Sequence, residues 1–277
     1  MDLAYWGFSR WPFQRQQAAD SSIVGASHEE GLARLLFLVD EHRRCGLLSG
    51  ATGTGKTCLF RRAASYARRQ GKWCLEIDAT GLDADELAWR MADQLLADCS
   101  SNMTPGRCWT LIQQQLANQA LIGQPVVAVI DNLDHAERGS SLAIRRMMNL
   151  AESSGAELTV LIAARGQLPD SSLSAEIELS VELTGWSQEE TSRFVTTSLR
   201  AAGTTIEIFS ADAIIVVQEI TQGNPKSVIQ VCDLSLMAAM SDDRHHVDAQ
   251  VVEAATAEFA PRRSTPDFVR ARQPALS

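Results

Sequence analysis

Gly50-Ala51-Thr52-Gly53-Thr54-Gly55-Lys56-Thr57 is the stretch that decides the fold. It follows an apolar run, Cys45 to Ser49, and opens a segment whose apolar residues recur at helical spacing. Glycines at these positions let successive backbone N–H groups turn inward around an anion. The helix that starts at the loop directs its positive dipole end at the same point. A strand, this loop and a helix in that order predict a phosphate-binding loop, and hence a nucleoside triphosphate site.

The loop pattern also assigns a task to each residue type. Lys56 is predicted to reach the β- and γ-phosphates, and the Thr57 hydroxyl to coordinate Mg²⁺. ATP and Mg²⁺ are therefore the expected cofactors. The expected nucleotide-binding residues in this stretch are Gly50, Ala51, Thr52, Gly53, Thr54, Gly55, Lys56, Thr57 and Cys58.

Composition limits the remaining possibilities. With 277 residues and 45% hydrophobic residues, the chain can form one sizeable α/β domain and a smaller one. The net charge of −9 disfavours broad binding to nucleic acid or to anionic membranes, although a local patch is compatible with either. The six cysteines form no C-x-x-C pair, which is typical of a reducing compartment. No leader is evident and no apolar run approaches the roughly 20 residues of a membrane span. A cytoplasmic protein without a transmembrane segment is expected.

Strand-like and helix-like segments alternate through the first two thirds of the chain. The run Val126 to Ile130 is apolar throughout, as in a parallel strand that is buried on both faces, and it ends at Asp131. Alternation of this kind predicts a doubly wound parallel sheet. Further strands are expected at 73–77, 158–163 and 177–183. Helices are expected to open at a Ser27 to Glu30 capping box, at Asp83 and at Thr104, and around 143–152.

From Thr184 onward the strand signal stops. Helix caps at Ser187, Ser210, Asn224 and Asp248 predict a small domain of four helices. The expected division is an aromatic N-terminal segment (1–26), a phosphate-loop α/β domain (27–183), a helical lid (184–260) and a disordered tail (261–277). The N-terminal aromatics are expected to pack against the lid or the sheet.

A phosphate-loop sheet followed by a helical lid resembles the plan of AAA+ ATPases. The closer resemblance is to ExeA/GspA-type secretion ATPases, and more loosely to TniB/MuB-like transposition helpers and origin-recognition-type ATPases. Besides the loop, the matching phrases are Tyr5-Trp6-Gly7-Phe8, Pro12-Phe13, Ser27-His28-Glu29, Glu190-Thr191, Leu199-Arg200-Ala201-Ala202-Gly203, Gly223-Asn224-Pro225-Lys226 and Val231-Cys232-Asp233.

The resemblance implies that Asp131 is the Walker B aspartate, which holds Mg²⁺ together with Thr57. It also exposes a departure, because the family usually carries a glutamate base immediately after this aspartate, where this chain has Asn132. An amide can orient a water molecule but cannot take its proton at neutral pH. Asp134 is the nearest substitute carboxylate, and Asp78 is a second candidate if its strand neighbours that of Asp131.

Other family positions also differ here. Related ATPases place a polar residue near the γ-phosphate at the end of the fourth strand, and in this chain only Arg165 could serve there. Glu176 stands where the family carries an arginine that acts across a subunit interface. Lys226 occupies the position of the lid arginine that touches the γ-phosphate, and it is expected to bind nucleotide. His28 is interpreted as a helix-start residue.

These observations predict an ATP-binding AAA+ module, a slow ATPase that acts as a nucleotide-dependent switch in an envelope or secretion-type assembly. The predicted catalytic residues are Asp131, Asn132 and Asp134, and the metal ligands are Thr57 and Asp131. Two alternatives stay open: a nucleotide-binding scaffold that does not hydrolyse, and a DNA-binding transposition or replication helper. The expected partners are ATP and protein partners of unknown identity, including membrane-associated ones. Assembly into a homo-oligomer is left open.

Overall fold

The computed structural model describes residues 3–13, 25–96, 103–166, 168 and 172–257. Within them, five parallel strands form one sheet in the order β2-β3-β4-β1-β5. Because the strands run the same way, their carboxyl ends meet at one edge, which is where ligands bind in open α/β sheets. The strands are β1 (Cys45–Gly50), β2 (Trp73–Asp78), β3 (Val126–Asp131), β4 (Leu158–Ala164) and β5 (Leu179–Leu183).

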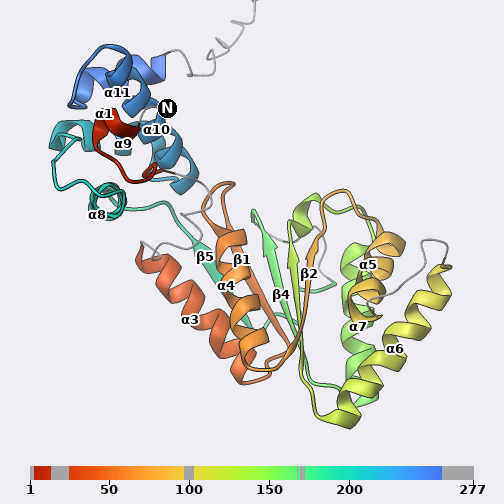
Figure 1. Cartoon of the computed structure of the whole chain (residues 1–277). Coiled ribbons are helices and arrows are strands. Elements are labelled where there is room, and N and C mark those ends of the chain that lie inside the picture. The colour runs from red at the N-terminus through yellow and green to blue at the C-terminus, as the bar shows by residue number, and fades with distance from the viewer. Residues whose placement is uncertain (1–2, 14–24, 97–102, 167, 169–171, 258–277) are drawn as a thin grey trace, which may run out of the picture.

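Helices cover both faces of the sheet, as a doubly wound fold requires (Figure 1). One face carries α3 (Ala26–Asp40) and α4 (Lys56–Arg69). The opposite face carries α5 (Ala84–Leu96), α6 (Pro105–Ile122) and α7 (Ser140–Ser154). A short 3-10 helix, η1 (Leu133–His135), follows β3.

Strand β3 shows how the two faces are divided. Val127 and Val129 join the buried cluster under α3 and α4, whereas Ala128 and Ile130 join the cluster under α5, α6 and α7. All six residues of the strand are buried. The unbroken apolar run therefore reflects two hydrophobic cores, one on each face, and it fixes Asp131 at the end of a rigid central strand.

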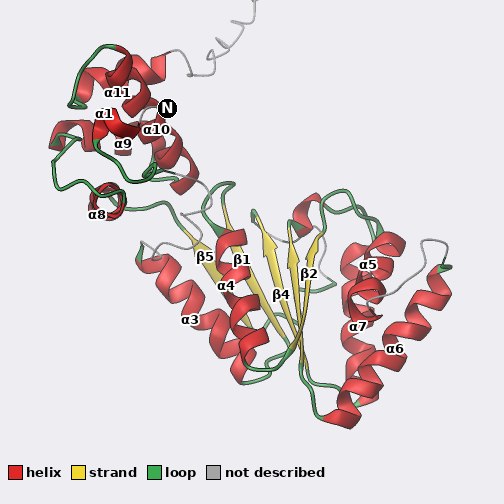
Figure 2. Cartoon of the chain, in the orientation of Figure 1, coloured by secondary structure: helices red, strands yellow, loops and turns green. Residues whose placement is uncertain are grey.

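A separate helical unit, the lid, follows β5 (Figure 2). Its buried core also contains four aromatic side chains from the N-terminal segment, Trp6, Phe8, Trp11 and Phe13. Ser9 joins the two segments, because its backbone N–H donates to the carbonyl of Ala202 at 2.7 Å. The N-terminal segment thus packs on the lid. The lid helices are α8 (Gln188–Ala201), α9 (Ala211–Thr221), α10 (Pro225–Ser241) and α11 (Ala249–Ala257), with α1 (Leu3–Trp6) beside them.

Most predicted helix caps are confirmed. The side chains of Thr104, Ser187, Ser210 and Asn224 each accept a hydrogen bond from a backbone N–H in the first turn of the following helix. Strand β5 begins at Leu179, two residues after the predicted start at 177. The predicted tail (261–277) lies outside the described residues.

The predicted capping box at Ser27 is wrong. Helix α3 already begins at Ala26 after Gly25, and no side chain of its own caps it. Instead, Glu190 of the lid accepts the Ala26 N–H at 2.6 Å, so a distant residue satisfies this helix start. Local spacing could not reveal a cap that lies 164 residues away.

No helix among the described residues is long and apolar enough to cross a membrane.

Candidate functional site

The predicted phosphate loop joins β1 to α4 at the carboxyl edge of the sheet. Gly53 and Gly55 have φ values of +88° and +98°, which residues with a side chain rarely adopt. Within the loop, both the backbone N–H and the hydroxyl of Thr54 donate to the carbonyl of Ala51, at 3.3 and 2.8 Å. Helix α4 starts at Lys56, so its N-terminus faces the loop as a phosphate site requires.

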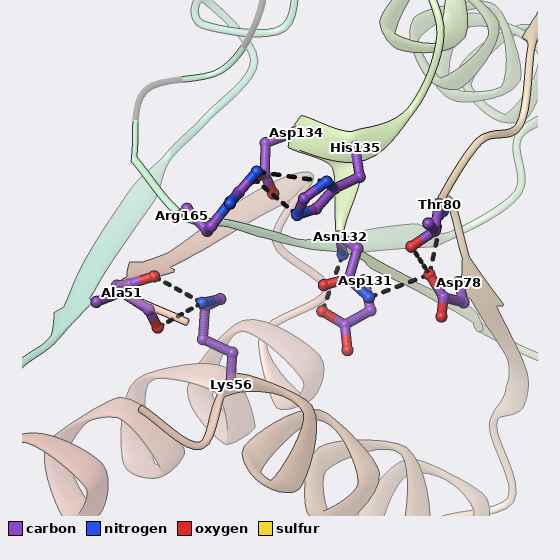
Figure 3. Close-up of polar contacts among 10 residues, drawn as sticks. Ala51, Lys56, Asp78, Thr80, Asp131, Asn132, Asp134, His135 and Arg165 are labelled. Atoms are coloured by element: carbon purple, nitrogen blue, oxygen red, sulfur yellow. Dashed lines mark hydrogen bonds and ion pairs between the residues drawn. The ribbon is translucent and has the colours of Figure 1, made fainter. Parts of the chain in front are cut away.

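Lys56 is buried and its ammonium group points into the loop (Figure 3). The Nζ atom donates to the carbonyls of Gly50 and Ala51 at 2.6 and 3.1 Å. Burial lowers the pKa of Lys56, while the negative charges of Asp131 and Asp134 act in the opposite direction. A buried ammonium that has only backbone carbonyls as close acceptors fits an anionic phosphate, which would give it a charged partner. The residues present therefore fit the predicted nucleotide.

Thr57 and Asp131 meet at the same edge. The Thr57 hydroxyl donates to Asp131 Oδ2 at 2.5 Å, and Asp131 is buried at the end of β3. One hydroxyl and one carboxylate fit Mg²⁺, which prefers oxygen ligands and is usually completed by substrate phosphates and water. Cys58 lies in the first turn of α4, where its backbone N–H already donates to the Gly55 carbonyl at 2.9 Å.

Asn132 and Asp78 form a pair beside this centre (Figure 3). Strand β2 neighbours β3, and Asp78 is in register with Asp131. The Asn132 amide Nδ2 donates to Asp78 Oδ1 at 3.1 Å, and the Thr80 hydroxyl donates to the same oxygen at 2.6 Å. Burial by itself would raise the pKa of Asp78, but these hydrogen bonds hold it below its ordinary value. A carboxylate and an amide thus lie together where the family pattern has a lone glutamate.

Asp134 makes a different contact. Its Oδ2 accepts a hydrogen bond from Arg165 Nε at 2.6 Å, and the Arg165 Nη2 lies 3.3 Å from His135 Nδ1. Burial would raise the pKa of Asp134, but the hydrogen bond from Arg165 and the proximity of His135 hold it below its ordinary value. Arg165 follows β4, so the structure brings the two charges together at the same edge as Lys56.

Glu176, which stands at the interface-arginine position of the family, lies elsewhere. It is 2.9 Å from Arg44 and 3.6 Å from Arg145. Arg44 directly precedes β1, so this cluster lies at the amino edge of the sheet, opposite the phosphate loop. Glu176 therefore takes part in an ion-pair cluster away from the candidate site.

The lid touches the phosphate loop directly. Asn224 Nδ2 donates to the Thr52 carbonyl at 2.8 Å, and the backbone N–H of Lys226 donates to the Gly53 carbonyl at 3.2 Å. A Cβ atom on Gly53 would lie 2.6 Å from Asn224 Oδ1 and 2.9 Å from Lys226 Cβ, so only glycine permits this approach. The side chain of Lys226 is exposed at the start of α10. Two predicted regions, the loop and the lid helix, thus come together.

His28 is the residue whose role the sequence interpretation missed. Its side chain is buried, and Nε2 lies 2.6 Å from the carbonyl of Thr54 in the loop. Because a carbonyl only accepts, Nε2 carries the hydrogen of this bond. Trp186 of the lid packs against the same ring at 6.2 Å between centroids. The His28 side chain therefore links α3, the loop and the lid, and no local spacing in the sequence signals that contact.

Comparison with known proteins agrees with this fold. Residues 39–170 match the family model described as an AAA domain. General secretion pathway protein A of Aeromonas hydrophila is 22% identical over 254 residues, which cover 89% of this chain and 46% of that protein. The chain thus spans about half the length of this curated relative.

Solved structures extend the likeness to the lid. Cdc6p of Pyrobaculum aerophilum superposes with a TM-score of 0.72 at 15% identity, over 88% of this chain and 71% of that chain. A chain of Drosophila ORC, in a structure with bound DNA, gives a TM-score of 0.69 at 19% identity, over 91% of this chain and 66% of that chain. Residues 39–170 therefore resemble an AAA domain, the chain has the α/β fold of AAA+ P-loop NTPases, and its sequence is similar to that of general secretion pathway protein A.

Proposed function

We propose that this chain is a nucleotide-dependent switch that binds ATP with Mg²⁺ and hydrolyses it slowly. The observation that carries the proposal is the pairing of a complete phosphate loop with an altered hydrolytic edge. Lys56 is buried in the loop and Thr57 contacts Asp131, while an amide, Asn132, stands beside them in place of a carboxylate. All the groups that would bind the nucleotide are therefore present, whereas the position of the water-activating glutamate is taken by an amide.

Each residue then has a defined task. Lys56 and the loop N–H groups hold the β- and γ-phosphates, and Thr57 with Asp131 holds Mg²⁺. When bound, Mg²⁺ neutralises the charge that develops on the phosphate oxygens. Because phosphoryl transfer depends mostly on positioning and electrostatics, this set supports turnover even with a weak base.

We assign the base to Asp78 in preference to Asp134. Asp78 is ionised at neutral pH and is tied to Asn132, whose amide oxygen remains an acceptor that can orient a water. In this assignment Asn132 positions the water and an oxygen of Asp78 takes its proton. Asp134 is engaged with Arg165, which makes it the weaker candidate.

The lid provides the switch. The lid contacts Thr52 and Gly53, which adjoin the residues proposed to hold the phosphates. A change in the conformation of the loop on hydrolysis would therefore change the contacts that hold α10 against it. Lys226, at the start of that helix, adds a positive charge for the triphosphate.

The sequence likeness to general secretion pathway protein A supports a role in an envelope or secretion-type assembly. We propose that the chain acts there in the cytoplasm together with protein partners. A DNA-binding helper role is the second candidate, favoured by the fold likeness to a Drosophila ORC chain whose structure contains DNA. Duplex binding that requires ATP and weakens steeply with salt would support this second role. The net charge of −9 argues against it.

The test is Mg²⁺-dependent phosphate release measured beside ATP binding, with Lys56→Ala as control for contaminating ATPases. The proposal expects binding and slow release, both lost in Lys56→Ala. Tight binding without release would instead identify a nucleotide-gated scaffold. Release that persists in Lys56→Ala is assigned to a contaminating ATPase, whereas ATP binding that persists at parental affinity in this variant would reject the proposed site.

A further inference from the structure

Successive carbonyl groups of the phosphate loop accept hydrogen bonds from donors outside the loop. The carbonyls of Thr52 and Gly53 accept from residues at the start of the lid helix α10, at 2.8 and 3.2 Å. The next carbonyl, that of Thr54, lies 2.6 Å from Nε2 of His28 on α3. The lid and α3 therefore restrain the loop from its outer side, and His28 supplies the restraint next to Lys56.

The contact with His28 fixes the orientation of one peptide group. Because a peptide is planar and trans, the Gly55 N–H points away from the side on which the Thr54 carbonyl meets His28. Gly55 has a φ of +98°, and glycine permits peptide rotations that other residues resist. The bond from His28 thus restrains a peptide that the glycine leaves free to rotate.

The lid holds the His28 ring in this position. Trp186, between β5 and α8, packs against the ring at 6.2 Å between centroids. A Cβ atom on Gly25 would lie 2.9 Å from both His28 Nδ1 and Trp186 Cδ1, so the two rings leave no room for a larger residue there. Glu190 of the lid accepts the Ala26 N–H at 2.6 Å, which anchors the start of α3 beside them.

The ring is a fixed donor in the Nε2–H form. Nε2 faces a carbonyl, which only accepts, while the Ser27 hydroxyl lies 3.4 Å from Nδ1 and can donate to it. Only 5% of His28 is exposed, and burial lowers its pKa, which keeps the ring neutral. Water therefore does not compete for this bond.

We propose that His28 is a positioning residue for nucleotide binding, which turns the peptide between Thr54 and Gly55 so that the Gly55 N–H faces the phosphates. This inference rests on the proposed nucleotide site, where the loop N–H groups cradle the α- and β-phosphates. His28 acts through the peptide and does not touch the nucleotide. Because hydrogen bonds in a chain polarise one another, a phosphate on the Gly55 N–H also strengthens the bond from His28. ADP and ATP carry the same two phosphates, so both depend on His28 equally.

The experiment measures dissociation constants for Mg²⁺-ADP and for the β,γ-imido analogue of ATP in the parent protein and three variants. His28→Leu fills the space without a donor, whereas His28→Gln restores an N–H donor. Gln119→Leu, which removes a buried polar side chain from α6 on the far face of the sheet, is the matched control. We expect His28→Leu to weaken both ligands about tenfold, as the loss of one well-oriented donor to a phosphate predicts. His28→Gln should stay within about threefold of the parent and Gln119→Leu within about twofold.

A second measurement uses the parent protein and therefore does not depend on the folding of a variant. With ¹⁵N in the histidine rings, we expect the Nε2–H signal of His28 to be protected from exchange with water. Addition of Mg²⁺-ADP should shift this signal, because the bond to Thr54 strengthens. Its absence from the spectrum of His28→Gln assigns the signal.

The inference is overturned if His28→Leu binds both ligands within about twofold of the parent, or if His28→Gln binds as weakly as His28→Leu. It is also overturned if Gln119→Leu loses as much affinity as His28→Leu, if the loss is confined to the ATP analogue, or if Mg²⁺-ADP leaves the Nε2–H signal unchanged. Parental affinity for ADP and the analogue in Lys56→Ala would, by contrast, reject the proposed nucleotide site itself, which keeps the two failures distinct.

Discussion

The phosphate loop and the end of β3 lie at one edge of one sheet, yet they follow the AAA+ pattern to different degrees. In the loop, Lys56 donates to the Gly50 carbonyl, Thr57 donates to Asp131, and the lid packs onto Gly53. Asp131 is the last residue of β3, Asn132 after it pairs with Asp78, and Asp134 pairs with Arg165. Under the proposed function, the side chains that would hold a nucleotide and those that would hydrolyse it form separate sets, and we expect that each set can be altered without the other.

The largest effect is expected from removing Lys56, which both ATP binding and ATP hydrolysis would need. We expect Lys56→Ala to weaken ATP binding about 100-fold or more, because at least two charge-assisted hydrogen bonds to phosphate are lost. Isothermal titration calorimetry of the variant against ATP checks this. Lys72→Ala is the matched control, since Lys72 bonds the Val39 carbonyl outside the loop. Equal affinities for ATP in the two variants would contradict the assignment of the loop.

Hydrolysis can then be separated from binding at the Asp78 and Asn132 pair. Asp78→Asn removes the proposed base, so we expect turnover to fall about 100-fold, the lower range for a general base, while the ATP dissociation constant stays within about twofold. Asp85→Asn, which changes an exposed carboxylate on α5, serves as the control.

The exchange variant sharpens this test. Asp78→Asn combined with Asn132→Asp restores one carboxylate and one amide in swapped places. Asn132 has a φ of +57°, a backbone conformation that aspartate tolerates better than glutamate does. We expect the double variant to regain at least part of the lost turnover in single-turnover assays. A double variant as inactive as Asp78→Asn alone would show that the carboxylate must stand on β2.

The sequence was sufficient for the elements that rest on local patterns. The loop residues, the buried run of β3 and the caps at Thr104, Ser187, Ser210 and Asn224 all lie where spacing and residue type predict them. These features depend on neighbours within a few residues, which is the range that a sequence pattern reports.

Contacts between distant segments could not be predicted in the same way. The Glu190 cap on α3 joins residues 164 positions apart, and the bond from His28 to Thr54 joins residues 26 apart. The pairing of Asp78 with Asn132 depended on which strands are neighbours, a condition that the sequence left open and the strand order satisfies. Such contacts are products of the tertiary fold.

A smaller effect is expected where the lid meets the loop. Asn224→Ala removes the N-cap of α10 and the bond to the Thr52 carbonyl, so we expect a loss of about 1 to 2 kcal/mol in stability. ATP binding should weaken several-fold because the lid is less firmly seated. Thermal unfolding with and without ATP measures both effects, and Ser210→Ala, which removes a lid cap away from the loop, is the control. Equal losses of ATP affinity in the two variants would contradict a specific role for the lid contact.

The smallest expected effect concerns pH. Burial lowers the pKa of His28 below its ordinary value of 6.5, while the Thr54 carbonyl and Glu190 act in the opposite direction. Because the unfolded chain then binds a proton more readily than the folded chain, stability falls as pH drops below about 6.5. His28→Gln keeps a donor for Thr54 and does not titrate, so its melting temperature should fall less than that of the parent between pH 7 and pH 5. An identical pH dependence in the two proteins would show that His28 is not the responsible group.

The most direct test of the separation between binding and hydrolysis is to measure ATP affinity and single-turnover hydrolysis on the same preparation of the parent protein and of Asp78→Asn. The account predicts unchanged affinity and a turnover rate that falls by about two orders of magnitude in the variant. A parental turnover rate in Asp78→Asn would contradict the account, because hydrolysis would then not depend on the pair formed by Asp78 and Asn132 at the ends of β2 and β3.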